Sequence, residues 1–264
     1  MGTTRWRGMH VHLLGPLHVE VDGRVLDVST WKSKRAVTLL KYLVARAGER
    51  VPRDVLVDLL WPDSEDGYKS THNLHTVVYY LRRTLEPELR RYEDPRFLRH
   101  VHGKYWIDTN APVWTDIEEF RRLIRQAEAV RSEDGRQSLT LYQRALALYR
   151  DDFCPEDLYE DWAVPFRERF RDLYFRATLH TAQLLVDVEG NFSDTIGLCR
   201  SALDRDPYRE ELHQALIGYL VKAGRYGEAA IQYRTCKRLL NEEFGLNPSP
   251  ATRALFDAMK HEIM

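Results

Sequence analysis

Residues 69–85 read KSTHNLHTVVYYLRRTL, and their apolar and polar side chains fall on opposite sides of a helix. At about 100° per residue, the apolar side collects Leu74, Val77, Val78, Leu81 and Leu85. The opposite side carries cations, a hydroxyl and aromatic rings: Lys69, His72, Thr76, Tyr79 and Arg83. The stretch contains no Asp or Glu, although a merely solvated helix interleaves both signs of charge. A carboxylate-free polar side is typical of a helix in the DNA major groove, where cations meet phosphates and donors meet base edges.

The segments on either side of this helix complete a winged helix-turn-helix pattern. Upstream, residues 11–28 alternate apolar and polar side chains and predict short strands that turn at Asp22-Gly23. Residues 35–47 and 54–61 repeat apolar side chains at helical spacing and predict two helices. Downstream, residues 97–108 predict a hairpin. In a module with this order of elements, the third helix reads bases and the hairpin tip contacts an adjacent groove or the phosphates.

The predicted recognition helix supplies most of the candidate DNA contacts: Lys69, Ser70, His72, Asn73, Thr76, Tyr79, Tyr80 and Arg83. Cations at the entry of the first helix are candidate phosphate contacts: Lys32, Lys34 and Arg35. The predicted tip of the hairpin adds Lys104 and Tyr105. Each set has a structural alternative, because surface cations can be simply solvated, Ser70 can cap its helix, and the hairpin can end in a bare turn.

An internal repeat of about 34 residues organises the second half of the chain. Gly190 and Gly224 lie 34 positions apart, as do Phe192 and Tyr226. Two further pairs keep the same spacing: Cys199 with Tyr233, and Ala202 with Cys236. A glycine, an aromatic and a small residue at this period are typical of tetratricopeptide repeats, which are stacked helical hairpins. Their concave surfaces bind peptides, protein partners or a second copy of the chain.

Further helices are predicted on both sides of the repeat. Residues 116–131 and 138–150 carry apolar stripes at helical spacing. Ser249-Pro250 begins a last helix, because Ser is a favoured N-cap and Pro is tolerated in the first turn. The predicted fold is mainly α, with a winged helix-turn-helix containing small antiparallel sheets over residues 1–112. An all-α, tetratricopeptide-like domain is predicted over residues 113–264.

Charge is distributed unevenly along the 264 residues, whose net charge is −1. Residues 1–112 carry a net charge of +4 and seven of the ten His, whereas residues 113–264 carry −5. The total argues against a uniformly basic, histone-like protein. The asymmetry favours a nucleic-acid reader joined to a protein-facing domain.

Several classes of protein are disfavoured by what the sequence lacks. It contains no GxxxxGK[ST], GxGxxG, HExxH or GxSxG motif, so we expect no enzyme activity and no cofactor. It also lacks a signal core and the roughly 20 consecutive apolar residues of a membrane span, which predicts a cytoplasmic protein without a membrane partner.

Cysteines and paired histidines carry no predicted chemistry. Cys154, Cys199 and Cys236 are few and far apart, which indicates helix packing in a reducing compartment rather than a disulfide framework. The sequences His10-Val11-His12 and His100-Val101-His102 each place two imidazoles on one face of a strand. No supporting Cys or carboxylate spacing accompanies them, so no metal site is predicted.

Several stretches together resemble the SARP family, the antibiotic regulatory protein type activators of bacteria. In the first half these are Trp31-Lys32-Ser33-Lys34-Arg35, Val51-Pro52-Arg53-Asp54, Leu59-Leu60-Trp61-Pro62, Asn73-Leu74-His75, Leu81-Arg82-Arg83-Thr84-Leu85 and Gly103-Lys104-Tyr105. In the second half they are Glu160-Asp161-Trp162-Ala163, Asp206-Pro207-Tyr208-Arg209-Glu210, Gly224-Arg225-Tyr226-Gly227-Glu228-Ala229 and Glu242-Glu243-Phe244-Gly245-Leu246-Asn247-Pro248-Ser249-Pro250. The resemblance covers about residues 10–262, and the order and spacing of the stretches make it specific.

The resemblance implies a winged helix similar to the output domains of response regulators, followed by a bacterial transcriptional activator domain. It implies a sequence-specific transcriptional activator that binds direct repeats of double-stranded DNA as a homodimer and recruits RNA polymerase. By analogy with the related response-regulator domains, the acidic loop residues Asp63, Glu65 and Asp66 are candidate polymerase contacts. Many family members carry Arg or Ser where this chain has the pair Tyr79-Tyr80, so the base sequence that it reads does not carry over.

Two other functions are compatible with the sequence. The chain could be a helical-repeat scaffold whose N-terminal module binds protein, in keeping with its acidic total charge. It could also be the output fragment of a larger signalling regulator. DNA binding at low and high salt distinguishes the scaffold from the regulator, because binding through phosphate contacts weakens as salt rises.

Overall fold

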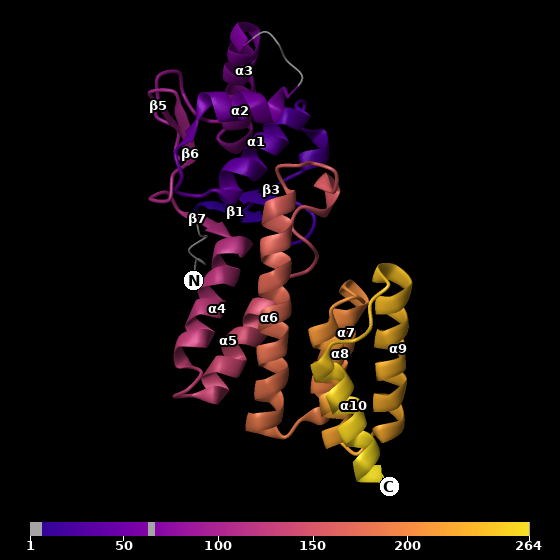
Figure 1. Ribbon diagram of the computed structural model, residues 1–264. Helices are drawn as coiled ribbons and strands as arrows, with labels where there is room; N and C mark the ends of the chain where they lie inside the picture. The colour runs from indigo at the N-terminus through magenta and orange to yellow at the C-terminus, as the bar shows by residue number, and fades with distance from the viewer. Residues whose placement is uncertain (1–6, 63–66, 264) are drawn as a thin grey trace. The chain divides into compact units, whose positions relative to one another are not determined.

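The computed structural model describes the backbone of residues 7–62 and 67–263, and the side chains of these residues apart from 67–71 and 260–263. The chain divides into two compact units (Figure 1). Met1–Arg121 and Leu148–Arg171 form the first unit, and Arg122–Ala147 and Asp172–Met264 form the second. Every described strand belongs to the first unit, and the second is built from helices.

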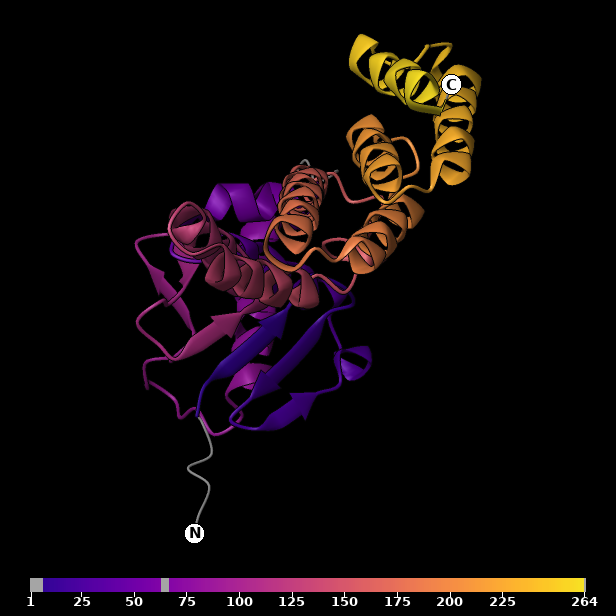
Figure 2. The same ribbon diagram turned by 90° about the horizontal axis from the view of Figure 1, so that it is seen from below.

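A four-stranded sheet begins the first unit, with its strands in the order β3-β2-β1-β7. The strands are β1 Met9–His12, β2 His18–Val21, β3 Arg24–Leu26 and β7 Val113–Thr115. Neighbouring strands are antiparallel except β1 and β7, which run parallel; Figure 2 shows β7 beside the indigo strands. Asp22 and Gly23 adopt φ values of +50° and +78° between β2 and β3, which is the conformation of the predicted two-residue turn.

Asp116 ties this sheet to the first turn of α4, which spans Asp116–Val130. Its fully buried carboxylate accepts the backbone N–H of Leu13 at 2.8 and 2.9 Å and that of Leu14 at 2.9 Å. Burial raises the pKa of Asp116 to about 6, against these hydrogen bonds, which favour the charged form. One side chain therefore satisfies two buried donors in the segment that follows β1.

Three helices form the core of the winged helix: α1 Lys34–Ala45, α2 Arg53–Leu60 and α3 Gly67–Leu85. The hydroxyl of Ser33 caps α1 by accepting the N–H of Ala36 at 3.2 Å. The apolar stripes predicted for these helices are buried, and Leu39, Leu56 and Leu81 are all fully inaccessible to solvent. Burial of these side chains holds the three helices against one another.

A second, three-stranded sheet forms the wing, in the order β4-β6-β5. Its strands are β4 Val51–Pro52, β5 Leu98–Val101 and β6 Lys104–Ile107. Val101 pairs with Lys104, so the turn consists of the two residues His102 and Gly103. Their φ values of +48° and +71° are those of a type I′ turn, which matches the twist of the strands.

A return segment, Leu148–Arg171, brings the chain back into the first unit after helix α5, which spans Gly135–Leu148. Phe153 of this segment is fully buried and forms an isolated β-bridge with Leu14. The ammonium of Lys41 on α1 is buried and lies 2.8 Å from a carboxylate oxygen of Glu156 and 2.8 Å from one of Asp157. The first unit therefore includes contacts between residues more than a hundred positions apart, such as Lys41 and Asp157.

The second unit contains the repeated helical hairpins. Its helices are the end of α4, α5 Gly135–Leu148, the later part of α6 Val164–Glu189, α7 Phe192–Arg205, α8 Glu210–Lys222, α9 Tyr226–Phe244 and α10 Pro250–Ile263. Gly190 and Gly224 take positive φ values of +63° and +71°, and α7 and α9 begin two residues after them. The period predicted from the sequence therefore marks equivalent points of two helical hairpins.

Two buried cysteines pack inside the second unit, and a serine caps its last helix. Cys199 and Cys236 are buried inside the second unit, and burial raises the pKa of their thiols to about 12 and about 11. Both are therefore neutral packing residues. The hydroxyl of Ser249 accepts the N–H of Thr252 at 3.3 Å and caps α10 as predicted.

The predicted fold class, a winged helix followed by tetratricopeptide-like helices, is confirmed. Element ends shift by a few residues where a side chain provides an earlier cap. α5 begins at Gly135 rather than at the predicted residue 138, because the carboxylate of Asp134 accepts the N–H of Gln137 at 2.9 Å. Among the described residues, no helix combines the length and apolar character required to cross a lipid bilayer.

Candidate nucleic-acid interface

The polar side of α3 is exposed along the described part of the helix. His72, Asn73, Thr76, Tyr80 and Arg83 are all exposed. Tyr79 is 59% exposed, although aromatic side chains are more often buried. Leu74, Val77, Val78, Leu81 and Leu85 are buried on the opposite side, so the helix presents the carboxylate-free side to solvent.

Several predicted contacts fall outside the described residues. Asp63, Glu65 and Asp66 of the acidic loop lie there entirely. The side chains of Lys69 and Ser70 do as well, although their backbone belongs to the first turns of α3.

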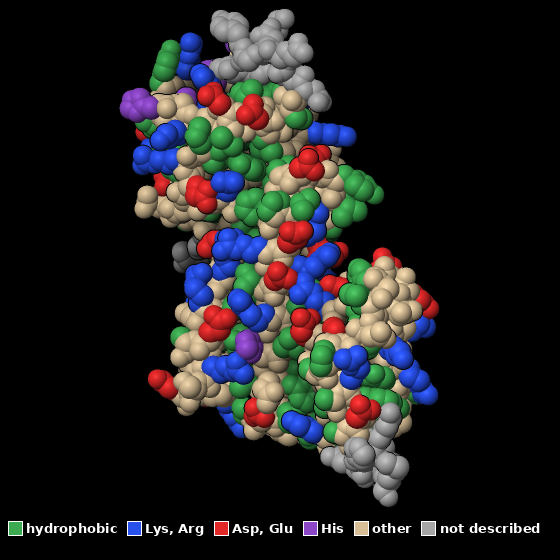
Figure 3. Space-filling model, in the orientation of Figure 1, with side chains coloured by type: hydrophobic (Ala, Val, Ile, Leu, Met, Phe, Trp, Pro, Cys, Tyr) green, Lys and Arg blue, Asp and Glu red, His purple; other side chains and the backbone are tan. Residues whose placement is uncertain are grey.

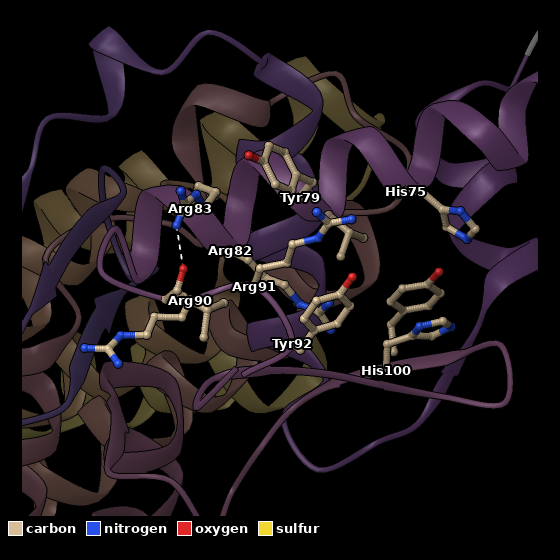
Figure 4. A pocket seen from close by; sticks show the side chains of 11 residues that line it. His75, Tyr79, Arg82, Arg83, Arg90, Arg91, Tyr92 and His100 are labelled. Carbon is tan, nitrogen blue, oxygen red and sulfur yellow. Dashed lines mark hydrogen bonds between the residues drawn. The ribbon is translucent and has the colours of Figure 1, made fainter. Parts of the chain in front are cut away.

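Arg83 has a second role that its sequence position did not suggest. Its Nη1 donates to the carbonyl oxygens of Pro87 at 3.2 Å and Leu89 at 2.6 Å. Figure 4 marks a hydrogen bond from this guanidinium with a dashed line. The side chain therefore holds the segment after α3 in place while its charge stays exposed.

Arg82 fixes the wing against α3. Its Nε donates to the carbonyl oxygen of Leu98 on β5 at 3.1 Å. The guanidinium is half-buried, and this burial lowers the pKa of Arg82 from its usual value. The helix and the hairpin are thus held together as one rigid surface.

The wing tip differs from its predicted composition. Lys104 is exposed as expected, but Tyr105 is only 1% exposed and stacks on His100 with ring centroids 4.1 Å apart. The turn consists of His102 and Gly103, so residue 105 already points to the core side of β6. Tyr105 is therefore corrected from a direct DNA contact to a packing residue beneath the wing.

The entry of α1 presents the predicted cations. Lys32 and Lys34 are exposed. Arg35 is exposed too, but its Nε donates to the carbonyl oxygen of Leu60 at 3.0 Å and its guanidinium lies 5.2 Å from the centre of the Trp61 ring. The side chain of Arg35 therefore binds the C-terminal end of α2, and its contact with phosphate stays a prediction.

A groove of about 670 Å³ runs along the side of α3 that faces the wing. Its walls come from α3, from β5 and β6, and from the segment that follows α3. His75, Arg82 and His100 line it together with Arg91 and Tyr92, which the sequence interpretation did not single out (Figure 4). In Figure 3, Lys, Arg and His side chains gather on the side of the first unit that carries β5 and β6.

The two histidine pairs do not converge. His10 and His12 belong to β1 in the four-stranded sheet, whereas His100 precedes the tip of the wing in the other sheet. Burial lowers the pKa of His12 to about 4. Within residues 7–62 and 67–263, no three His, Cys, Asp or Glu side chains are grouped so as to hold a metal ion.

Two family models match the chain. The model described as "Transcriptional regulatory protein, C terminal" matches residues 27–104. The model described as "Bacterial transcriptional activator domain" matches residues 115–260, more than half of the chain. The two matches together cover both halves of the fold described above.

Curated relatives carry the same pair of regions. Regulatory protein AfsR of Streptomyces coelicolor is 27% identical over 245 residues, which cover 92% of this chain and 23% of that protein. Transcriptional regulator RedD of the same organism is 25% identical over 253 residues, covering 93% of this chain and 68% of RedD. Transcriptional regulatory protein EmbR of Mycobacterium tuberculosis is 26% identical over 260 residues, covering 92% of this chain and 61% of EmbR. The chain thus spans about a quarter of the length of AfsR.

A solved structure shares the fold. It is Mycobacterium tuberculosis EmbR in complex with a low affinity phosphopeptide, with a TM-score of 0.82 and 23% sequence identity. The match covers 97% of this chain and 66% of that one. At 23% identity, this match establishes that the two chains share the same arrangement of helices and strands.

Proposed function

The chain belongs to the SARP family of bacterial transcriptional regulators, and on that premise we propose that it binds double-stranded DNA in a sequence-specific manner and activates transcription. We assign DNA binding to residues 1–112, completed by the return segment, and regulation or dimerisation to residues 113–264. The observation that carries the proposal is the exposed side of α3, which presents no carboxylate between His72 and Arg83.

Affinity and selectivity come from different side chains on this surface. Exposed cations, including Lys32, Lys34 and Lys104, neutralise phosphates and release condensed counterions, which supplies most of the affinity. Exposed donors and acceptors on α3, such as Asn73 and Thr76, read base edges in the major groove. Because Tyr79 and Tyr80 are also exposed, apolar contact with thymine methyl groups adds to the readout.

The family also suggests how binding leads to activation. We propose that two copies bind direct repeats side by side and recruit RNA polymerase in the cytoplasm, with the acidic loop containing Asp63 as one contact. The helical hairpins of the second unit provide the kind of surface that binds a protein partner or a second copy.

Binding to DNA is tested by a gel shift of the purified full chain with fragments of its own genome at about 50 and 200 mM salt. We expect selective retardation of a few fragments, with affinity falling steeply as salt rises. A chain that retards no fragment at either concentration refutes the proposal and favours a protein-binding scaffold.

Asn73→Ala is expected to change the base preference more than the overall affinity. An Asn amide recognises adenine with two hydrogen bonds, so its loss should reduce discrimination at one position by roughly tenfold, or about 1.4 kcal/mol. In vitro selection of bound DNA, followed by sequencing, measures this change. Asn241→Ala, an exposed Asn on α9, is the matched control and should leave the selected motif unaltered. An unchanged motif for Asn73→Ala would remove this residue from base readout.

A further inference from the structure

The groove beside α3 has a chemistry that a nucleic-acid backbone fits. We propose that it holds one sugar–phosphate strand of the bound duplex, so that Arg91 and Tyr92 form a third DNA-contacting element beside α3 and the wing. The inference rests on the proposed function. It adds a contact made by the segment between Leu85 and Leu98, which joins α3 to β5.

The carboxylates of this joining segment lie away from the groove. Arg91 and Tyr92 line the groove, together with Arg82 from α3, and no Asp or Glu is among the described residues that line it. The carboxylates of the same segment line a separate hollow together with Arg96: Glu86, Glu88, Glu93 and Asp94. A sequence that mixes both signs of charge thus produces one groove whose charged lining residues are cations, and such a groove attracts an anion.

Arg91 is available for an external anion. No carboxylate within the described part of the chain forms an ion pair with its guanidinium, which instead lies 5.0 Å from the centre of the Tyr92 ring. Tyr92 itself is 91% exposed, although it is a large aromatic side chain. A guanidinium beside an exposed ring can bind a phosphate while the ring packs on the adjoining sugar.

The segment is held rigidly at both ends. The carboxylate of Glu86 accepts the N–H of Arg96 at 2.9 and 3.1 Å, and Arg96 in turn forms two hydrogen bonds with Asp22 at 2.8 and 3.2 Å. At the other end, Arg83 binds the carbonyl oxygens of Pro87 and Leu89. A segment fixed in this way loses little conformational entropy when it binds a ligand.

The position of the groove favours a strand of the duplex over a small anion. One wall carries His75 and Tyr79 of α3, and the opposite wall carries His100 of the wing. When a recognition helix lies in the major groove and a wing reaches the adjacent minor groove, the backbone between the two grooves passes between helix and wing. Arg82, which joins α3 to β5, lies at this crossing point.

An exposed arginine of the second unit provides a matched control. Arg91 lies beside Tyr92 in the groove (Figure 4), whereas Arg234 lies on α9 and is not among the residues that line the groove. Both are exposed, so either alanine variant removes one charge without disturbing the core. The salt dependence of binding is measured by titrating the full chain with a selected DNA fragment over about 50–200 mM salt.

Arg91→Ala is expected to reduce the slope of log K against log salt by about 0.9 and to weaken binding several-fold, while Arg234→Ala leaves the slope nearly unchanged. Tyr92→Ala should weaken binding a few-fold without changing the slope. Equal slopes for the Arg234 and Arg91 variants would overturn the inference but not the proposed function, because general surface charge would then explain both.

A small-anion role is tested in the same proteins. Calorimetric titration with inorganic pyrophosphate is expected to show either no binding to the wild-type chain or binding that Arg91→Ala leaves unchanged. If the variant loses pyrophosphate binding but keeps the DNA slope of the wild type, the groove binds a small anion and the inference is wrong. A wild-type chain that binds no DNA overturns the proposed function itself, and this inference with it.

Discussion

Thr76→Glu is expected to reduce DNA affinity about 100-fold, or roughly 2.8 kcal/mol. Thr76 is exposed at the middle of the polar side of α3, and its hydroxyl donates to the carbonyl oxygen of His72 at 3.4 Å. A carboxylate at this position would face the phosphates and base edges, where like charges repel. Glu has a higher helix propensity than Thr, so the fold should be retained. Gel shift or fluorescence anisotropy at fixed salt measures the loss.

Thr140→Glu is the matched control for this variant. Thr140 is an exposed residue on α5, and its hydroxyl makes the same kind of bond, to the carbonyl oxygen of Arg136 at 3.0 Å. The control introduces the same charge into the second unit and should leave affinity within about twofold of wild type. Equal affinities for the two variants would show that the exposed side of α3 does not face DNA, and the central proposal would fail.

Asp116→Ala is expected to destabilise the first unit by about 3–5 kcal/mol. The substitution leaves the N–H groups of Leu13 and Leu14 without an acceptor, although both residues are fully buried. Each unsatisfied buried donor costs about 1–3 kcal/mol, and the loss of the side chain adds a small cavity. The variant should therefore unfold at a much lower urea concentration than the wild type.

Tryptophan fluorescence reports this unfolding selectively, because all six Trp residues of the chain lie within the first unit. Asp27→Ala is the control, since Asp27 also accepts a backbone N–H, that of Ser29 at 3.0 Å, but is exposed. Its loss should cost about 1 kcal/mol, as for other helix N-caps. If both variants unfold at the same urea concentration, burial of the Asp116 contacts does not decide the stability of this unit.

The periodic parts of the fold were predictable from the sequence, because burial is read directly from side-chain spacing. Helix α3 is the clearest case, since Leu74, Val78 and Leu81 recur on one face and are buried in the structure. The 34-residue spacing of Gly190 and Gly224 identified the helical hairpins for the same reason.

Tyr105 shows where this reasoning fails. A strand alternates its faces, so shifting the position of a turn by one residue reverses which side chains point outward. The sequence placed Tyr105 at the predicted tip of the hairpin, whereas the turn occupies His102 and Gly103 and Tyr105 faces the core. Strand β7 has 3 residues, which are too few to show the alternation of apolar and polar side chains that identifies a strand.

Contacts between residues distant in sequence were also beyond prediction. Nothing in the local pattern indicates that Arg83 binds the carbonyl oxygens of Pro87 and Leu89, or that Asp116 accepts hydrogen bonds from Leu13 and Leu14. Arg91 was overlooked because its segment mixes both charges, and the separation of the carboxylates of this segment from the groove exists only in three dimensions.

A gene truncated after codon 112 would encode Lys41 without Glu156 and Asp157. The ammonium of Lys41 would lose both carboxylates that lie 2.8 Å from it, and with them the ion pairs that hold α1 to the return segment. The same cut would remove Phe153, which bridges to Leu14. The smallest portion of this chain suited to transplantation into a chimaeric regulator is therefore the winged helix together with residues up to 171, not the winged helix by itself.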